Sequence, residues 1–304
     1  MAWLRVRLKA SSAQLPLLEA GLEALGALAV TSSDAGDEPI VEPAPGETPL
    51  WARLRVEALF AEAVDPERVR AALRHFAFLP DSLLIDILGD ADWQNAWRQH
   101  AVQACFGGRL WVLPRDAAAP QGSARGALLR LDPGLAFGTG SHPTTRLCLE
   151  WLATHPLEGL EVLDLGCGSG ILALAALKLG CHSVHAIDHD PQALLATKDN
   201  AAYNALADER LVLGEPADLQ SADSAGDGTF DLVVANILAN PLIELAAEIT
   251  RQTRVGGRIV LSGLLAGQAE AVQAAYPQMD FDNPACEADE HGALWARLEA
   301  TRRI

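Results

Sequence analysis

Hydrophobic and polar residues alternate with a period of two over residues 3–9, and residues 13–25 carry apolar side chains at helical spacing. We expect strands at 3–9, 27–31, 51–60 and 83–88, and helices at 13–25 and 66–75. Asp65 and Pro66 favour a helix start, because Asp caps free amide groups and Pro fits the first turn. This order of elements is the split βαβ pattern of a small α+β, ferredoxin-like domain.

The pattern changes near residue 128, where strand-like runs begin to alternate with helical segments. The expected strands are 161–165, 183–188, 210–213, 230–235, 257–262 and 292–298, and the expected helices are 170–179, 191–203, 239–252 and 266–275. Strands separated by helices predict βαβ units and a largely parallel sheet, so the fold class of this part is α/β.

A stretch between the two patterns matches neither of them. It begins with a helical segment that carries Trp93 and Trp97 on one face, continues with a strand at 110–113, and ends in a run rich in Pro, Ala and Gly. We therefore expect three parts, which are a ferredoxin-like domain at 1–89, a connector at 90–127 and a Rossmann-like domain at 128–304.

The composition is that of a globular protein with an acidic surface: of 304 residues, 50% are hydrophobic, and the net charge is −17. Such a charge argues against direct nucleic-acid binding and suits a basic partner. Five scattered cysteines without a Cys-x-x-Cys pair argue against a disulfide framework and a zinc site, so we expect no metal. Neither a secretory leader nor an apolar run of about 18 residues occurs, so we expect a cytoplasmic protein outside the membrane.

A glycine-rich loop follows the strand at 161–165, with glycines at Gly166, Gly168 and Gly170. Glycines let the backbone turn sharply and approach a ligand, and the next helix presents free N–H groups to it. The dinucleotide-binding pattern Gly-x-Gly-x-x-Gly would place its third glycine at Ile171, where a β-branched side chain stands instead. Asp188 ends the next strand, where a carboxylate can accept hydrogen bonds from both hydroxyls of a ribose.

A second loop precedes this sheet and contains Gly140, His142, Thr144 and Thr145. The threonine hydroxyls can cap the helix that follows or bind a ligand, and the glycines allow the loop to act as a lid. His142 is a candidate base, although a structural hydrogen-bonding role is the more common one for such a histidine.

The strand at 230–235 ends in the segment Asn236-Ile-Leu-Ala239. Ligands of open α/β sheets bind at the carboxyl ends of the strands, so Asn236 is expected to face the reacting group. Its amide oxygen can hold a target amine, and the alternative role is that of a polar residue that ends the strand.

Taken together, these segments resemble the ribosomal protein L11 methyltransferase (PrmA) family. The motifs that carry the resemblance are Leu131-Asp-Pro-Gly-Leu-Ala-Phe-Gly-Thr-Gly140, His142-Pro-Thr-Thr145, Asp164-Leu-Gly-Cys-Gly-Ser-Gly170, Ile187-Asp-His-Asp-Pro191 and Asn236-Ile-Leu-Ala239, with Pro45-Gly-Glu-Thr48 and the Trp93/Trp97 segment. The similarity spans nearly the whole chain.

The resemblance implies a recognition domain, a linker and a Rossmann-like methyltransferase domain with a largely parallel, seven-stranded sheet. It also implies transfer of several methyl groups from S-adenosylmethionine to lysine side chains and the N-terminal amine of one basic ribosomal protein. Matching the motifs places cofactor contacts at Thr145, Gly166, Asp188 and Asn236, to which we add Gly140, Thr144 and Gly168 as candidates. Asn236 is the residue expected closest to the chemistry, and no general base carries over.

The expected reaction needs little more than positioning of a neutral amine, because the sulfonium is a good leaving group. Rival readings are a methyltransferase for another protein amide, a small molecule or RNA, a nicotinamide-dependent oxidoreductase, and a cofactor-binding regulator. No aromatic residue follows Asn236 to pack on a planar target, and Ile171 disfavours the oxidoreductase. The N-terminal domain could instead serve dimerisation. We expect a monomer, but the sequence leaves open the oligomeric state, the target lysines and the number of methyl groups.

Overall fold

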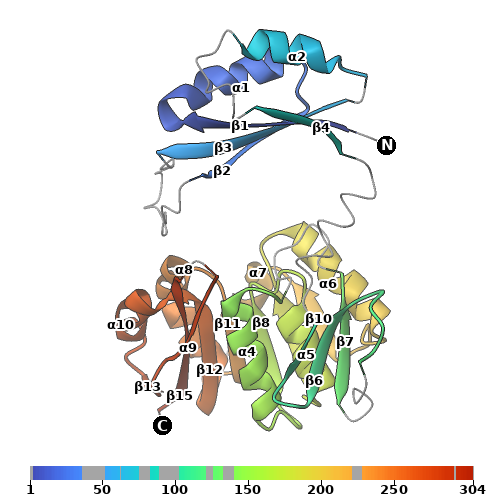
Figure 1. Cartoon of the computed structure of the whole chain (residues 1–304). Helices are drawn as coiled ribbons and strands as arrows, with labels where there is room; N and C mark the ends of the chain where they lie inside the picture. The colour runs from blue at the N-terminus through green and yellow to red at the C-terminus, as the bar shows by residue number, and fades with distance from the viewer. Residues whose placement is uncertain are drawn as a thin grey trace. The chain divides into compact units, whose positions relative to one another are not determined.

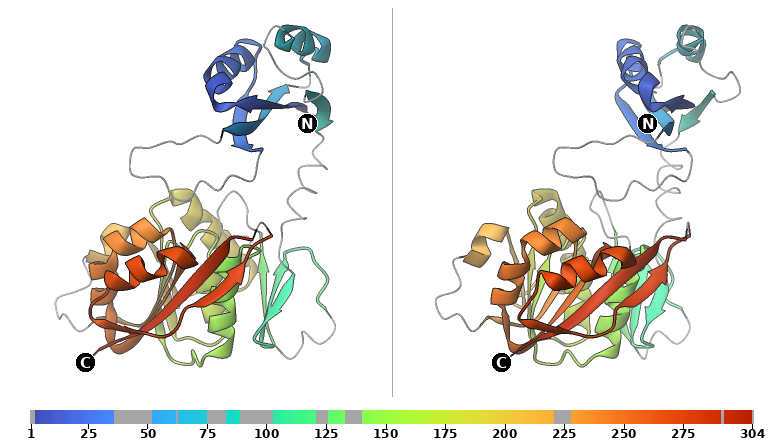
Figure 2. Two further views of the ribbon diagram at one scale, coloured as in Figure 1. Left: turned by 60° about the vertical axis from the view of Figure 1, so that its left-hand side comes forward. Right: turned by 90° about the vertical axis from the view of Figure 1, so that its left-hand side faces the viewer.

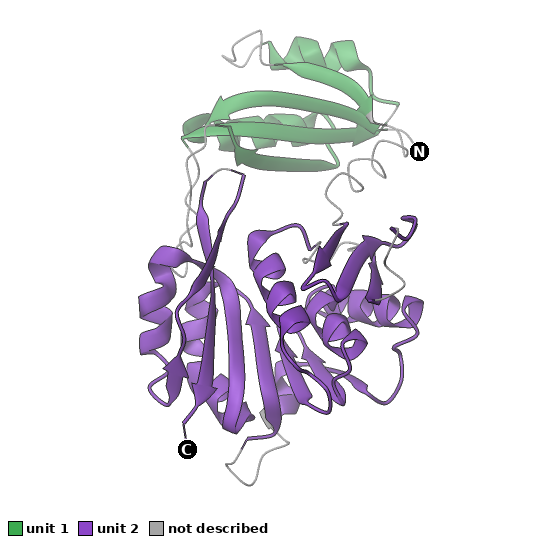
Figure 3. Ribbon diagram, turned by 60° about the horizontal axis from the view of Figure 1, so that its bottom comes forward, with its two compact units in different colours: residues 1–99 green, residues 100–304 purple. Residues whose placement is uncertain are grey.

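The computed structural model describes residues 3–35, 52–61, 63–74, 83–88, 103–120, 126–132, 140–220, 228–290 and 292–303. The chain forms two compact units, residues 1–99 and 100–304, which Figure 3 shows in two colours. Each unit has a hydrophobic core made only of its own residues. None of the helices described is long and apolar enough to cross a membrane.

The first unit is a four-stranded antiparallel sheet with two helices on one face (Figure 1). Its elements are β1 (Trp3–Ser11), a 3-10 turn (Ser12–Gln14), α1 (Leu15–Ala24), β2 (Ala29–Asp34), β3 (Arg53–Ala61), α2 (Pro66–Leu73) and β4 (Leu84–Leu88). The strand order is β2-β3-β1-β4. This is the predicted split βαβ arrangement, with element bounds within a few residues of those expected.

Local sequence explains these elements directly. Strand β1 buries Leu4, Val6 and Leu8 against the helices, while its alternate residues face the other side of the sheet. There Arg5 donates a 3.1 Å hydrogen bond to Asp86 of β4, and this bond holds the pKa of the Asp86 carboxyl below its usual value. Helix α2 begins where predicted, with the Asp65 side chain accepting from the N–H of Glu67 at 3.0 Å.

The second unit is built on a sheet of eight strands, seven of them in the order β10-β9-β8-β11-β12-β15-β13, while β14 pairs with β15. The strands are β8 (Glu161–Leu165), β9 (Ser183–Ile187), β10 (Leu211–Gly214), β11 (Phe230–Asn236), β12 (Thr253–Leu265), β13 (Met279–Phe281), β14 (Ala285–Ala288) and β15 (Leu294–Arg302). Pairing is parallel from β10 to β12, and β15 is antiparallel to its neighbours. The predicted largely parallel, seven-stranded sheet is confirmed, and β14 extends it.

Helices cover both faces of this sheet (Figures 1 and 2). One face carries α4 (Pro143–Thr154), α5 (Ile171–Lys178) and α6 (Pro191–Tyr203), and the other carries α7 (Pro216–Gln220), α8 (Ala239–Glu244), α9 (Ala246–Gln252) and α10 (Ala269–Ala274). The prediction of one helix over 239–252 is wrong, because the helix breaks at Leu245. The helix predicted over 266–275 begins as a 3-10 turn at Ala266–Gln268.

A separate three-stranded sheet of β5 (Ala104–Phe106), β6 (Leu110–Pro114) and β7 (Ala127–Leu131) belongs to the second unit. Apolar residues of these strands, such as Phe106, Val112 and Leu129, join the core formed by α4 and α5. The described part of the stretch 90–127 is therefore packed on the second unit. The segment with Trp93 and Trp97, and residues 45–48, lie outside the described residues.

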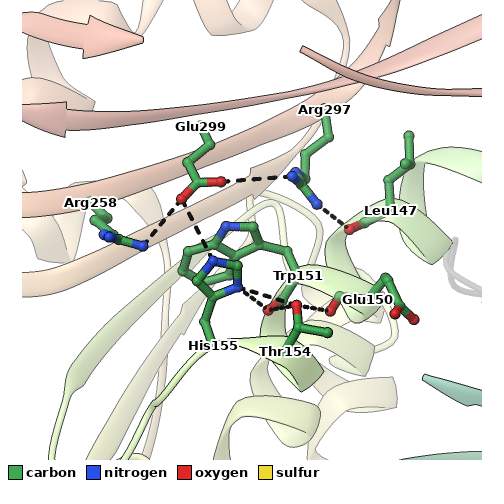
Figure 4. A network of polar contacts seen from close by, with 8 residues as sticks. All are labelled: Leu147, Glu150, Trp151, Thr154, His155, Arg258, Arg297 and Glu299. Atoms are coloured by element: carbon green, nitrogen blue, oxygen red, sulfur yellow. Dashed lines mark hydrogen bonds and ion pairs between the residues drawn. The ribbon is translucent and has the colours of Figure 1, made fainter. Parts of the chain in front are cut away.

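Hydrogen bonds and ion pairs connect helix α4 with strands β12 and β15 (Figure 4). Glu299 of β15 forms ion pairs with Arg258 at 3.2 Å and with Arg297 at 3.7 Å, and lies 3.9 Å from His155 at the end of α4. Arg297 also donates to the carbonyl of Leu147, one turn into the helix, at 3.2 Å. These contacts hold α4 in place while its first turn faces the carboxyl edge of the sheet.

Candidate functional site

A pocket of about 770 Å³ opens at the carboxyl ends of β8, β9 and β11. Strand β8 has β9 as its neighbour on one side and β11 on the other. The pocket therefore lies at the point where the strand order changes direction, which is where open α/β sheets bind their ligands. Its lining comes from the loops after these strands, from the start of α4 and from β15: His142, Thr144, Thr145, Leu165, Gly166, Cys167, Gly168, Ile171, Leu172, Ile187, Asp188, His189, Asp190, Ala193, Pro216, Asn236, Ile237, Leu238, Pro241, Leu245, Gly263 and Trp295.

The predicted glycine loop forms the floor of this pocket, with Gly166 and Gly168 in the lining. Gly166 has a φ of 77°, and a Cβ at this position would overlap the Cγ2 atom of Ile237. The backbone N–H groups of Gly166 and Cys167 donate to the carbonyl of Ile187 at 2.8 and 3.1 Å, which ties the loop to the end of β9. Only a glycine fits at position 166, because both the backbone angle and the available space exclude a side chain.

Asp188 lies in the same pocket, at the end of β9, and is only 8% exposed. One carboxylate oxygen accepts from the N–H of Gly168 at 2.9 Å, and the other accepts from the N–H of Asp190 at 3.0 Å. These bonds fix the carboxylate beside the glycine loop, and each oxygen keeps a second lone pair for a ligand hydroxyl.

A second, fully buried carboxylate lies beneath the loop. Asp164 accepts a 2.9 Å hydrogen bond from the N–H of Ala173, one of the free amide groups at the start of α5. Burial raises the pKa of Asp164 to about 7, and the nearby charge of Asp188 adds to the effect. Asp164 therefore stabilises the helix that follows the loop, and it is not among the residues that line the pocket.

The start of α4 forms the opposite side of the pocket. His142 caps the helix, since its Nδ1 atom accepts from the N–H of Thr144 and lies 2.8 Å from the hydroxyl of that residue. Burial lowers the pKa of His142, so the ring is neutral at pH 7. Gly140 is buried but does not line the pocket, and residues 133–139 of the predicted lid loop lie outside the described residues.

Asn236 faces the pocket from the end of β11 and donates a 3.1 Å hydrogen bond from Nδ2 to the hydroxyl of Thr145. This bond orients the amide so that its oxygen is the atom available to a ligand amine. The next residue, Ile237, is enclosed by Gly166 on one side and by Gly263 on the other, where a Cβ would overlap the Ile237 carbonyl. The backbone that carries Asn236 is therefore held closely by both neighbouring strands.

Trp295 is a lining residue that the sequence did not indicate. It begins β15, and its ring meets that of His142 edge to face with 4.6 Å between centroids. Its indole N–H donates to Asp289 at 2.9 Å. No local motif marks Trp295, because only the antiparallel pairing of β15 with β12 brings it to this edge of the sheet.

The glycine loop and Asp188 suit a ribose and an anionic group, while Asn236, His142 and Trp295 line the same pocket from β11, from the start of α4 and from β15. A largely parallel sheet that carries a Gly-x-Gly-x-Gly loop after one strand and an acidic residue after the next defines a Rossmann-like methyltransferase.

Comparison with known proteins names the family within that class. The model of the ribosomal protein L11 methyltransferase (PrmA) family matches residues 2–303. A ribosomal protein L11 methyltransferase of Pseudomonas syringae pv. tomato is 45% identical over 307 residues, covering 100% of both chains. One of Pseudomonas aeruginosa is 46% identical over 308 residues, covering 100% of this chain and 99% of its own. The chain belongs to the PrmA family.

A solved structure agrees with this assignment. The ribosomal protein L11 methylase of Lactobacillus delbrueckii subsp. bulgaricus is 32% identical to this chain, with a TM-score of 0.56. The match covers 64% of this chain and 96% of that protein. The fold of the second unit is therefore that of a methyltransferase of the same family.

Proposed function

We propose that this protein transfers methyl groups from S-adenosylmethionine to amino groups of ribosomal protein L11, the substrate that names its relatives. The observation that carries the proposal is a single pocket lined by the glycine loop, Asp188 and Asn236. The finer part of the proposal is the choice of lysine side chains and the N-terminal α-amine as acceptors. A ribosomal protein as substrate supports a cytoplasmic location for the proposed reaction.

The residues present suit S-adenosylmethionine. Asp188 would hold the ribose hydroxyls, and Gly166 and Gly168 of the glycine loop line the same pocket, where the ligand would contact them. Gly168 and the pocket residues at the start of α4, Thr144 and Thr145, would contribute further contacts, whereas Gly140 would act through the backbone that leads into α4. The bound cofactor supplies an electrophilic methyl group on a sulfonium centre.

The remaining task of the chain is to hold an amine without its proton. The pKa of a free lysine is near 10.4, so removing the proton at pH 7 costs roughly 4–5 kcal/mol. Apolar residues beside Asn236, Leu165 and Ile237 among them, favour the uncharged amine by excluding water. Neutral His142 adds no charge there, and the Asn236 amide oxygen is placed to accept a hydrogen bond from the amine.

Charge and shape support a basic protein as the acceptor. The net charge of −17 favours encounter with a lysine-rich partner. The segment after Asn236 is Ile-Leu-Ala, without an aromatic side chain to stack on a planar amide or base. A tetrahedral amine, which can rotate between successive transfers, fits that segment better.

Replacing Asn236 with alanine is expected to lower the rate of methyl transfer on the order of 100-fold, because a misplaced amine no longer reaches the methyl group in line. Binding of S-adenosylmethionine, measured by calorimetry, should change much less. Asn240→Ala, an exposed change on the adjoining helix α8, serves as the control. A normal transfer rate in the Asn236 variant would remove this residue from the mechanism.

The substrate itself can be identified by incubating the protein with radiolabelled S-adenosylmethionine and unmethylated ribosomal proteins. We expect label in the band of ribosomal protein L11, and mass spectrometry of that band should place the methyl groups on lysine and N-terminal amines. Label in RNA or in another band would overturn the proposed substrate.

The first unit is proposed to recognise ribosomal protein L11. Both units have cores of their own, so removal of residues 1–99 is expected to leave the second unit folded and its affinity for S-adenosylmethionine unchanged. Methylation of ribosomal protein L11 by the shortened protein should fall at least 100-fold, because the docking contacts are lost. If the shortened protein methylates L11 at the full rate, the first unit has another role, such as dimerisation.

A further inference from the structure

Helix α6 carries two asparagines one turn apart, Asn200 and Asn204, and both are buried. A buried amide is costly unless its donors and acceptors find partners. The Asn204 side chain pairs with the N–H and the carbonyl of Arg130, at 2.8 and 2.6 Å. The Asn200 side chain pairs in the same way with the N–H and the carbonyl of Asp132, at 3.0 and 3.1 Å.

Along one edge of β7, these two side chains bond to backbone N–H and C=O groups that would otherwise pair with a neighbouring strand. Strand β6 pairs with the other edge, where the N–H of Arg115 donates to the carbonyl of Leu131. Arg130 and Asp132 are two positions apart, so their backbone N–H and C=O groups point to the same edge of the strand. On the edge of β7 that faces α6, the backbone groups of Arg130 and Asp132 are thus hydrogen-bonded to side-chain amides.

Asn200 differs from Asn204 in its further contacts, one of which is to the glycine loop. Its Nδ2 group also donates to the carbonyl of Ser169 at 2.9 Å, and its Oδ1 atom also accepts from Arg115 at 3.1 Å. One turn earlier on α6, the hydroxyl of Thr197 donates to the carbonyl of Gly168 at 3.0 Å. Helix α6 therefore holds two successive carbonyls of the loop.

The Asn200 amide thus joins the glycine loop to the end of β7. Ser169 belongs to the loop, and Asp132 directly follows Leu131, the last residue of β7. If either segment shifts alone, a buried hydrogen bond to Asn200 is lost. Binding energy at the loop and the position of residue 132 are linked through that bond.

We propose that Asn200 is a positioning residue that holds the glycine loop against the end of β7 and so keeps the loop in the conformation that binds the cofactor. The inference rests on the proposed binding of S-adenosylmethionine in this pocket. Asn200 does not line the pocket, so its expected effect on cofactor affinity acts through the glycine loop.

Asn200→Ala should weaken S-adenosylmethionine binding about tenfold by calorimetry, since a buried hydrogen bond of typical strength is lost at the loop. The KM for the cofactor should rise by a similar factor, while kcat at saturating cofactor stays within about twofold. Asn204→Ala is the matched control, because it removes the same kind of bonds from the β7 backbone and a 2.8 Å bond to the Asn200 carbonyl, but none from the loop. Both variants should lower the Tm, but only the first should lower the affinity.

Asn200→Asp provides a second variant in case the alanine variant does not fold. The carboxylate can still accept from the Asp132 N–H and pair with Arg115, but it can donate neither to the Ser169 carbonyl nor to the Asp132 carbonyl, so affinity and Tm should both fall. Equal affinities in the Asn200 and Asn204 variants would overturn the inference. A wild-type protein that does not bind S-adenosylmethionine would instead overturn the proposed function.

Discussion

Gly166→Ala is expected to abolish detectable binding of S-adenosylmethionine and to destabilise the second unit by about 2–5 kcal/mol. The left-handed backbone at a φ of 77° costs a residue with a side chain about 1–2 kcal/mol. The new methyl group would also overlap Ile237, and forced overpacking adds about 1–3 kcal/mol. Calorimetry with S-adenosylmethionine and thermal unfolding measure the two effects.

Two further variants separate the cost of the left-handed backbone from the cost of the steric overlap with Ile237. Gly159 has a similar φ of 81° with nothing near its Cβ position, so Gly159→Ala should show only the smaller, conformational cost and bind the cofactor normally. Combining Gly166→Ala with Ile237→Ala removes the overlap and should recover part of the stability lost in Gly166→Ala. If Gly166→Ala binds the cofactor as well as Gly159→Ala does, the loop does not form the cofactor site.

Asp188→Ala is expected to raise the Kd for S-adenosylmethionine on the order of 100-fold or more. Two hydrogen bonds from ribose hydroxyls to a charged group are worth about 1.5–3 kcal/mol each, and every 1.4 kcal/mol is a factor of ten. The change also removes the acceptors of the Gly168 and Asp190 N–H groups, so the loop keeps only its backbone bonds to the Ile187 carbonyl at the end of β9. Calorimetry gives the Kd directly.

Asp199→Ala is the matched control for Asp188→Ala. Asp199 is exposed on α6 and does not line the pocket, so its loss changes the net charge equally and should leave the Kd unchanged. Asp188→Asn keeps the size of the side chain but turns an N–H group toward a backbone donor, so it should also bind weakly. An Asp188→Ala variant with wild-type affinity would show that the ribose lies elsewhere.

The core of the candidate site could be predicted from the sequence because its signals are local. The glycine spacing, the carboxylate at Asp188 and the amide at Asn236 each follow directly on a strand that its own hydrophobic pattern predicts. Parallel strands end at one edge of the sheet, so these residues had to meet once the strands were parallel. The helix starts at Asp65 and Asp190 are equally local, since a cap bonds to an N–H group two residues further on.

Other features depended on which segments pack together, and local patterns do not carry that information. The expected helix over 239–252 breaks at Leu245, although its apolar spacing continues. Strands β13 and β14 are three and four residues long, too short for a period of two to stand out. The three-stranded sheet of β5, β6 and β7 is stabilised by the core it shares with α4 and α5.

The amino-acid sequence alone determined the α/β class and the ferredoxin-like N-terminal unit. It also determined the glycine loop, the Asp188 carboxylate and the Asn236 amide of the pocket, because spacing along the chain encodes them. Three contacts came from the folded chain: Trp295 against His142, Thr145 with Asn236, and Asn200 between two backbone segments. Each joins residues far apart in sequence, so it requires the order and register of the strands, which no single segment specifies.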